Sequence, residues 1–166
     1  GMLDLDKIEN DSKNPISFLS VMMANNETGI IQDLPKIIEW AKLKKIITHT
    51  DAVQALGKIT VDFEMLEVDA MTISSHKIYG PQGVAALILN KKIDMSAFIM
   101  GGGQEKGLRS GTENIAAIIG FGKACERTKE HMVLLNRNIK PLQVQLISEL
   151  KKMGALIFGE NSERLN

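Results

Sequence analysis

The chain alternates short, continuous apolar runs with amphipathic segments, a pattern typical of strands and helices that follow one another. Three β-branched or apolar runs, at residues 15–25, 46–52 and 69–75, lack a helical stripe and predict buried strands. A fourth run, residues 84–90, follows a Gly-Pro turn and is expected to pair antiparallel with the third. This alternation predicts an α/β domain with a mostly parallel sheet and flanking helices.

The polar positions between the strands predict the helices. Asp33 is placed to cap a helix that has Pro35 in its first turn. The apolar stripe of this helix is Leu34, Ile37, Ile38 and Ala41. A helical turn is expected in "DFEMLEV", and helical spacing returns at residues 115–128 and 140–153. The last apolar piece, residues 154–160, is expected to be strand-like.

Composition narrows the class of protein. The chain has 166 residues, of which 44% are hydrophobic, enough for one globular domain with a core. Twenty basic and twenty acidic residues cancel, so neither nucleic acid nor an anionic membrane is an expected partner. No signal peptide is expected in the mixed N-terminus, and one cysteine excludes an internal disulfide and a cysteine-based zinc site. We therefore expect a cytoplasmic protein without a metal site.

Polar side chains follow three of the predicted strands. Asn25-Asn26 end the first strand, Asp51 ends the second, and the segment Ser74–Lys77 ends the third. In parallel α/β sheets, ligands bind beyond the carboxyl ends of the strands. The sequence therefore predicts one pocket that combines amide, carboxylate, hydroxyl, imidazole and amine groups.

Lys77 suggests the chemistry of this pocket. A lysine partly removed from water can lose its proton and attack a carbonyl, as the lysine that binds pyridoxal phosphate does. Asp51 would keep the cofactor's ring nitrogen protonated, Ser74 and His76 would bind the phosphate, and Gln54 would reach the ring hydroxyl. Each residue alone also has an ordinary explanation, as a solvated lysine, a turn-forming aspartate or a histidine that satisfies backbone groups.

Four motifs, in order, carry a family resemblance. They are "ANNETGIIQD", "HTDAVQALGK", "SSHKIYGPQGVAAL" and "GGGQEKGLRSGTEN". Together they closely resemble the class V aminotransferase family, and within it the cysteine desulfurases of the NifS and IscS type. The resemblance runs from about Ile16 to about Met132. It implies the large domain of a fold type I pyridoxal phosphate-dependent transferase.

The resemblance also implies a role for each matching residue around the ring. Lys77 matches the lysine that forms the Schiff base, and Asp51 matches the carboxylate paired with the pyridine nitrogen. Gln54 matches the residue that bonds the ring hydroxyl. Asn26 matches an amide near the ring and the substrate carboxylate.

Further matches concern the phosphate. Ser74 and His76 match phosphate ligands, and Ser75 stands where glycine or alanine is usual, with a backbone N–H that could still serve the phosphate. Thr112 matches a threonine that reaches the phosphate in the other subunit of a homodimer. L-cysteine as substrate and a sulfur-accepting scaffold protein as partner follow from the same resemblance.

The family's chains are more than twice as long. Residues 1–15 are expected not to match, 16–128 to form part of the cofactor-binding domain, and 129–166 to begin a truncated small domain. The family's nucleophilic cysteine comes later on a mobile loop, and Cys125 is interpreted as an ordinary helix residue. A truncated gene, a split gene and a cloned piece would each explain a chain of this length. The phosphate contacts that the family has in its N-terminal segment are missing, and their loss is expected to weaken cofactor binding.

Three functions remain open from sequence. The first is a cysteine desulfurase-like protein that is inactive by itself. The second is a non-catalytic module for dimerisation or partner binding. The third is another class V enzyme such as a selenocysteine lyase, although "RSGTEN" favours the desulfurase branch.

Overall fold

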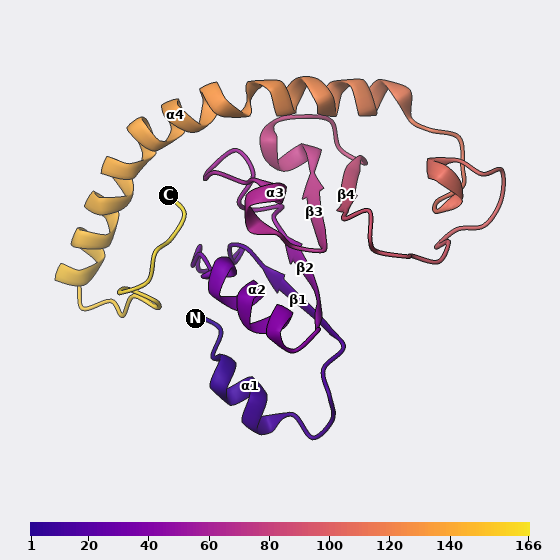
Figure 1. The fold of residues 1–166 in the computed structure, drawn as a ribbon. Helices are drawn as coiled ribbons and strands as arrows, with labels where there is room; N and C mark the ends of the chain where they lie inside the picture. Colours follow the sequence, from indigo (N-terminus) through magenta and orange to yellow (C-terminus); the bar gives the residue numbers. More distant parts are fainter.

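A four-stranded sheet forms the centre of the molecule. The computed structural model describes all 166 residues. The strands lie in the order β1 (Phe18–Met22), β2 (Ile47–Asp51), β3 (Ala70–Ser74) and β4 (Ala85–Leu89). β1, β2 and β3 are parallel, and β4 is antiparallel to β3 (Figure 1). The predicted α/β class and the antiparallel final strand are thus confirmed.

The chain forms six helical segments, and α2 has the predicted cap. Asp33 accepts a hydrogen bond from the backbone N–H of Lys36 at the start of α2. Asp62 does the same for Met65 in α3, the predicted helical turn. The segments are α1 (Leu5–Asp11), α2 (Leu34–Leu43), α3 (Phe63–Leu66), the 3-10 turns η1 (Ser75–Ile78) and η2 (Glu105–Gly107), and α4 (Ile115–Lys152).

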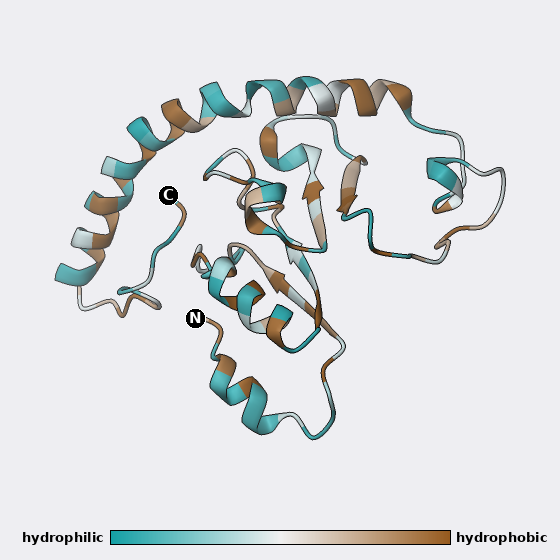
Figure 2. Ribbon diagram, viewed as in Figure 1, coloured by the Kyte–Doolittle hydropathy of each residue, from teal (hydrophilic) through white to brown (hydrophobic).

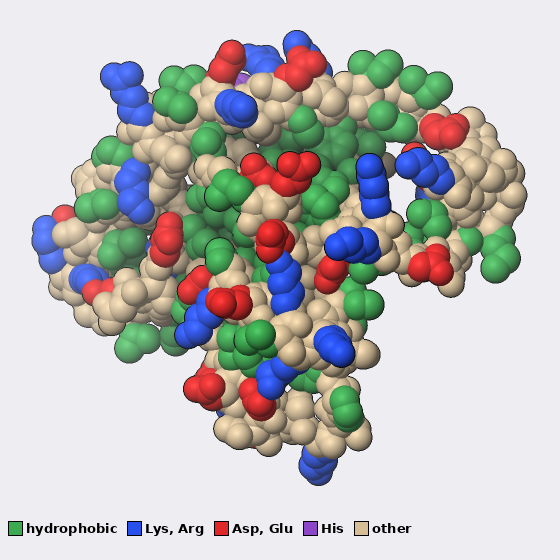
Figure 3. Space-filling model, viewed as in Figure 1, with side chains coloured by type: hydrophobic (Ala, Val, Ile, Leu, Met, Phe, Trp, Pro, Cys, Tyr) green, Lys and Arg blue, Asp and Glu red, His purple; other side chains and the backbone are tan.

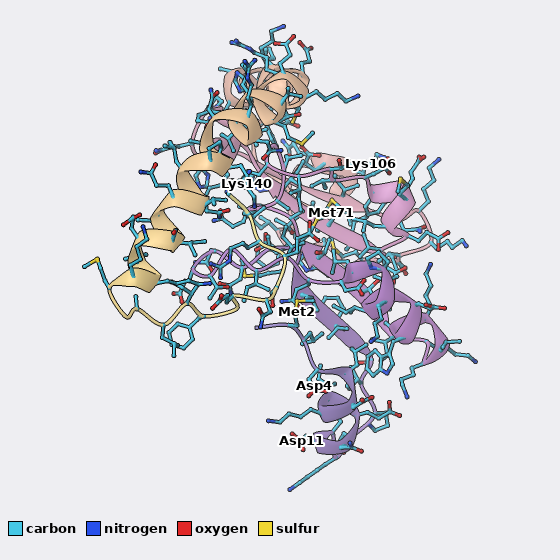
Figure 4. The ribbon with its side chains drawn as sticks, turned by 90° about the vertical axis from the view of Figure 1, so that its left-hand side faces the viewer. Met2, Asp4, Asp11, Met71, Lys106 and Lys140 are labelled. Carbon is cyan, nitrogen blue, oxygen red and sulfur yellow. The ribbon has the colours of Figure 1, made fainter.

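One face of the sheet, here called the α2 face, is packed against α2. Side chains alternate across a strand, so Val21, Thr50 and Met71 share this face. The predicted α2 stripe is buried, and Ile37 and Ile38 join Met71 in the main apolar cluster. Figure 4 places Met71 in the middle of the molecule, and Figure 2 shows apolar residues along the strands.

The opposite face, here called the open face, keeps large apolar side chains in contact with solvent. Phe18 is 55% exposed, Ile47 43% and Leu87 46%. The same alternation and register place five polar side chains on this face: Ser20, His49, Asp51, Thr72 and Ser74. The polar ends of the strands therefore belong to the less covered side of the sheet.

The C-terminal helix corrects one prediction. Two helices were expected at 115–128 and 140–153, but α4 is one helix of 38 residues (Figure 1). Residues 129–139 contain strong helix formers and no glycine, so nothing ends the helix between the two predicted segments. Pro141 lies inside the helix, where its missing N–H leaves one carbonyl without its usual partner.

The tail corrects a second prediction. Residues 154–160 form turns rather than a strand. Backbone pairing occurs further on, where Ile30 and Arg164 form an isolated bridge and the N–H of Leu165 donates to the carbonyl of Gly29. Leu165 is buried and joins the main apolar cluster, so the tail is packed against the body beside its paired backbone.

α4 packs closely against the loop that follows η1. A Cβ at Gly80 would collide with the hydroxyl of Ser75 and lie 3.0 Å from the Cβ of Ala124 on α4. A Cβ at Gly120 would lie 2.6 Å from Cγ of Pro81. Two glycines therefore permit the close approach that fixes this loop against the helix. No helix in the structure has both the length and the apolar character needed to cross a membrane.

Candidate active site

Parallel pairing brings the predicted site segments to one edge of the sheet. Met22 of β1 and Thr72 of β3 are both in register with Asp51 of β2, and Ser74 ends β3. The segments that follow these strands all leave at their carboxyl ends. The three strand ends therefore meet at one edge of the sheet, while the single pocket expected there stays a prediction.

Asp51 lies at the end of the central strand. One carboxylate oxygen, Oδ1, accepts a hydrogen bond of 2.9 Å from the backbone N–H of Val53, which shapes the turn after β2. The other oxygen makes no hydrogen bond within the chain. Asp51 is only partly buried, so one acceptor remains available to a cationic group.

Ser74, His76 and Lys77 follow one another in β3 and η1. The hydroxyl of Ser74 lies 2.9 Å from Nδ1 of His76, while the side chains of His76 and Lys77 are exposed. The 3-10 turn ends at Tyr79, which has a left-handed φ of 67° and turns the chain toward α4. The Lys77 amine makes no hydrogen bond within the chain and is available to a ligand.

Lys58 is a neighbour of this site that the sequence did not reveal. Its amine donates to Oε1 of Gln54 at 3.0 Å, which leaves the amide nitrogen of Gln54 free to donate. Burial, and then the charge of Lys77, lower the pKa of Lys58 below its usual value. The spacing of four residues between Gln54 and Lys58 was the available signal.

Lys58 also borders a cavity of about 500 Å³ between the C-terminal half of α4 and the C-terminal segment. Its lining includes Lys140, Asn136 and Arg164. Figure 3 shows hydrophobic side chains gathered below α4, with charges of both signs scattered around them. None of the predicted cofactor-site residues lines this cavity, so it is not the pocket that the sequence predicts at the strand ends.

Ser75 differs from its expected role. Its backbone N–H donates to the carbonyl of Val84 at 3.2 Å and is not free for a phosphate. Its side chain is fully buried, and the hydroxyl has no hydrogen-bond partner. The hydroxyl faces Gly80, where a glycine or alanine at position 75 would leave more room. This arrangement argues against the proposed contact between Ser75 and a phosphate.

The two asparagines after β1 have different roles. Oδ1 of Asn25 accepts hydrogen bonds from the backbone N–H groups of Glu27 and Thr28, so this side chain builds the turn. Asn26 is exposed and makes no side-chain hydrogen bond within the chain. Of the two amides, only that of Asn26 is free for a ligand.

Thr112 lies apart from the other site residues along the fold. It is exposed and belongs to the segment between β4 and α4, which Figure 1 shows projecting from the body on the right. Figure 4 shows the position of this segment by its residue Lys106, which belongs to η2. Arg109 pairs with Ile99 in an isolated bridge, and Ser110 is buried, so the segment has local order.

A hydrogen-bonded row across three strands was also missed from sequence. Nδ1 of His49 lies 2.8 Å from the hydroxyl of Ser20 on β1, and Nε2 lies 2.8 Å from the hydroxyl of Thr72 on β3. Burial lowers the pKa of His49, while the Asp51 carboxylate acts in the opposite direction. These contacts are those of a packed side chain that joins neighbouring strands.

The single cysteine, Cys125, lies on α4 and is partly buried. Burial raises the pKa of its thiol. A raised pKa reduces the thiolate fraction and hence the nucleophilicity at neutral pH. These features match an ordinary helix residue.

Comparison with known proteins identifies the class. The family model described as aminotransferase class V matches residues 1–165. The chain therefore belongs to the class V aminotransferase family. The match includes residues 1–15, so the family relationship extends beyond the motifs, while the division into domains stays a prediction.

The relatives are cysteine desulfurases and NifS-like proteins. The chain is 37% identical to the cysteine desulfurase IscS of Colwellia psychrerythraea over 99% of its length, and 40% identical to that of Pasteurella multocida over 100%. It superposes on a NifS-like protein from Rickettsia africae with a TM-score of 0.91 and 39% identity, over 99% of this chain and 47% of the other. The chain spans 41–42% of the length of these two curated relatives.

The available groups suit pyridoxal phosphate, the cofactor expected for this family. Lys77 offers a free amine, Asp51 a free carboxylate oxygen, and Gln54 an amide donor, all near the same strand ends. Ser74 and His76 add a hydroxyl and an imidazole. The donor set thus fits the cofactor's aldehyde, ring nitrogen, ring hydroxyl and phosphate, with the exception of Ser75.

Proposed function

We propose that this chain carries the pyridoxal phosphate-binding part of a cysteine desulfurase-like protein, which mobilises sulfur from L-cysteine for iron–sulfur cluster assembly or a related pathway. The observation that carries the proposal is the parallel register of β2 and β3, which puts Asp51 beside the strand that leads into Lys77. Identity to cysteine desulfurases over nearly the whole chain supports it.

The roles of the side chains follow from their chemistry. Lys77 would hold the cofactor covalently, and Asp51 would keep a proton on the ring nitrogen, because an opposite charge favours the protonated form. Gln54 would bind the ring hydroxyl, Asn26 would lie near the ring and the substrate carboxylate, and Ser74 with His76 would bind the phosphate. When bound, the cofactor supplies an electron sink for reactions of an amino acid substrate.

The first experiment tests covalent cofactor binding. Purified protein is titrated with pyridoxal phosphate, the visible absorbance is recorded, and the product is reduced with borohydride and mapped by peptide mass spectrometry. We expect the label on Lys77 and its loss in Lys77→Ala. Lys58→Ala is the matched control, because Lys58 is a neighbouring amine with a lowered pKa. A label on Lys58 alone, or no label in the wild type, would contradict the assignment.

Desulfuration needs a thiolate acceptor as well as the cofactor. Cys125 is partly buried and has a raised pKa, so it is poorly suited to this step. We therefore propose that this chain alone releases no sulfide from cysteine above the level of free cofactor. A sulfide assay tests this directly, and loss of robust release in Cys125→Ser would show that the acceptor lies in this chain after all.

The expected partners belong to the same proposal. A homodimer, in which Thr112 reaches the phosphate of the other subunit, accords with its exposed position in the projecting segment. A sulfur-accepting scaffold protein and a cytoplasmic location follow from the family. Analytical ultracentrifugation of the wild type and Thr112→Ala, with and without cofactor, tests the dimer and the role of Thr112.

A second candidate function is a non-catalytic partner-binding module. The exposed apolar side chains of the open face, Phe18, Ile47 and Leu87, favour it. The two functions separate in the cofactor titration, because a partner-binding module needs no covalent label on Lys77.

A further inference from the structure

The row formed by Ser20, His49 and Thr72 has a defined geometry on the open face. Ser20 is in register with His49, but the residue of β3 in register with His49 is Ala70 rather than Thr72. The methyl side chain of Ala70 leaves room for the imidazole to reach diagonally to Thr72 at 2.8 Å. One side chain thus joins β1, β2 and β3 just before their carboxyl ends.

The residues next in line on the same face belong to the candidate site. Asp51 follows His49 by two residues on β2, and Ser74 follows Thr72 by two residues on β3, so each pair shares a face. Thr72 is itself in register with Asp51. Any shift of β3 relative to β2 would therefore change the position of Ser74 and Lys77 relative to Asp51.

The charge state of His49 also bears on Asp51. Asp51 is the charged group whose field acts on His49. A protonated imidazole beside Asp51 would offset the negative charge of the carboxylate. That charge is what attracts a cationic ligand. Partial burial opposes protonation of the ring. The hydroxyls of Ser20 and Thr72 fix the orientation of the ring, because each contacts one of its nitrogens.

We propose that His49 is a positioning residue: held between Ser20 and Thr72, it fixes the carboxyl ends of three strands and leaves the Asp51 carboxylate uncompensated for a cationic ring nitrogen. This inference rests on the proposed function, since it concerns the same cofactor site. It assigns a role to Ser20 and Thr72, which lie outside the four sequence motifs, and to His49, which opens the motif "HTDAVQALGK".

The first test uses Thr72→Val, which keeps the shape of the side chain and removes the hydroxyl. We expect cofactor affinity, measured by absorbance titration, to fall about threefold to tenfold, the range for loss of one neutral hydrogen bond. Thr72→Ser retains a hydroxyl and should bind like the wild type. The matched control is Thr50→Val on the α2 face, where the Thr50 hydroxyl donates to the carbonyl of Val21 at 3.0 Å. This control should lower stability and leave affinity unchanged.

The second test needs no cofactor. Histidine ring nitrogen NMR should show His49 neutral at pH 7, with shifts that change in Ser20→Ala and Thr72→Val. In Asp51→Asn the pKa of His49 should fall further, because the carboxylate that raises it is gone. An unchanged pKa, or ring shifts insensitive to both hydroxyl variants, would overturn the positioning role.

The outcomes separate the two proposals. If the wild type binds no pyridoxal phosphate, the proposed function fails, and the positioning role fails with it. If the wild type binds the cofactor but Thr72→Val and Thr50→Val bind it as well as the wild type does, only the positioning role is refuted. Weaker binding in Thr72→Val alone, restored in Thr72→Ser, supports both.

Discussion

The α2 face and the open face come from the same four strands, yet they bury very different amounts of their side chains. On the α2 face, Met71 is 1% exposed and packs with Ile37 and Ile38 of α2. On the open face, Phe18 and Leu87 are about half exposed and the polar row of His49 lies between them. Stability is therefore concentrated on one face, and the candidate chemistry lies at the carboxyl end of the other.

The largest difference is expected between two isoleucines. Ile38→Ala removes a side chain that is 3% exposed and should lower the free energy of unfolding by about 2–5 kcal/mol. Ile47→Ala removes the same atoms from a site that is 43% exposed and should cost less than about 1 kcal/mol. Urea unfolding of both variants measures the contrast. Equal losses would show that the open face is covered in solution, for example by a second molecule.

The contact between α4 and the loop after Lys77 gives an intermediate effect. Gly80→Ala should lower the free energy of unfolding by about 1–3 kcal/mol, because the new Cβ meets Ser75 and Ala124. Ser75→Ala removes a buried hydroxyl that has no hydrogen-bond partner, and it should raise the free energy of unfolding by about 1 kcal/mol. The double variant should recover part of the loss. Gly122→Ala, in an open position of the same helix, is the control and should be neutral or stabilising.

If the Gly80 variant were as stable as the wild type, the close packing of α4 on this loop would be refuted. Stability that Ser75→Ala failed to recover in the double variant would instead place the collision at Ala124. The two results also bear on Lys77, because the same loop fixes the turn that carries it.

Elements with local signals were predictable from the sequence. Asp33 and Pro35 mark the start of α2, and β-branched runs mark β2 and β3, because caps and periodicity act over a few residues. The single helix α4 and the turns at 154–160 were not predictable in this way. Their form depends on a proline tolerated inside a helix and on the burial of Leu165 in the main apolar cluster.

The residues of the candidate site also divide into those that the sequence predicts and those that it does not. Asp51 and Lys77 were identifiable, because each follows a strand and the motifs around them resemble a family. The different roles of Asn25 and Asn26 were not, since both amides stand in the same loop and only hydrogen-bond geometry separates them. The row joined by His49 depends on strand register, which one sequence does not reveal.

The smallest expected effect is the contribution of His49 to the pH dependence of stability. Burial lowers its pKa in the folded state, so below about pH 6.5 the unfolded chain takes up the proton first. This contribution is therefore complete above about pH 6.5 and is lost as the pH falls toward the folded pKa. Because the ring is partly exposed, the effect is modest.

Urea unfolding at pH 7.5 and 5.5 should show a smaller loss of stability on acidification in His49→Gln than in the wild type. Glu9 and Glu67 affect stability mainly at a pH below 5.5, because the pKa of each is lowered from the ordinary carboxyl pKa of 4.5. An equal loss in the two proteins would mean that His49 is as hydrated in the folded state as in the unfolded chain. The open face would then be more accessible to water than its hydrogen-bonded row indicates, and the contrast with the α2 face would be larger still.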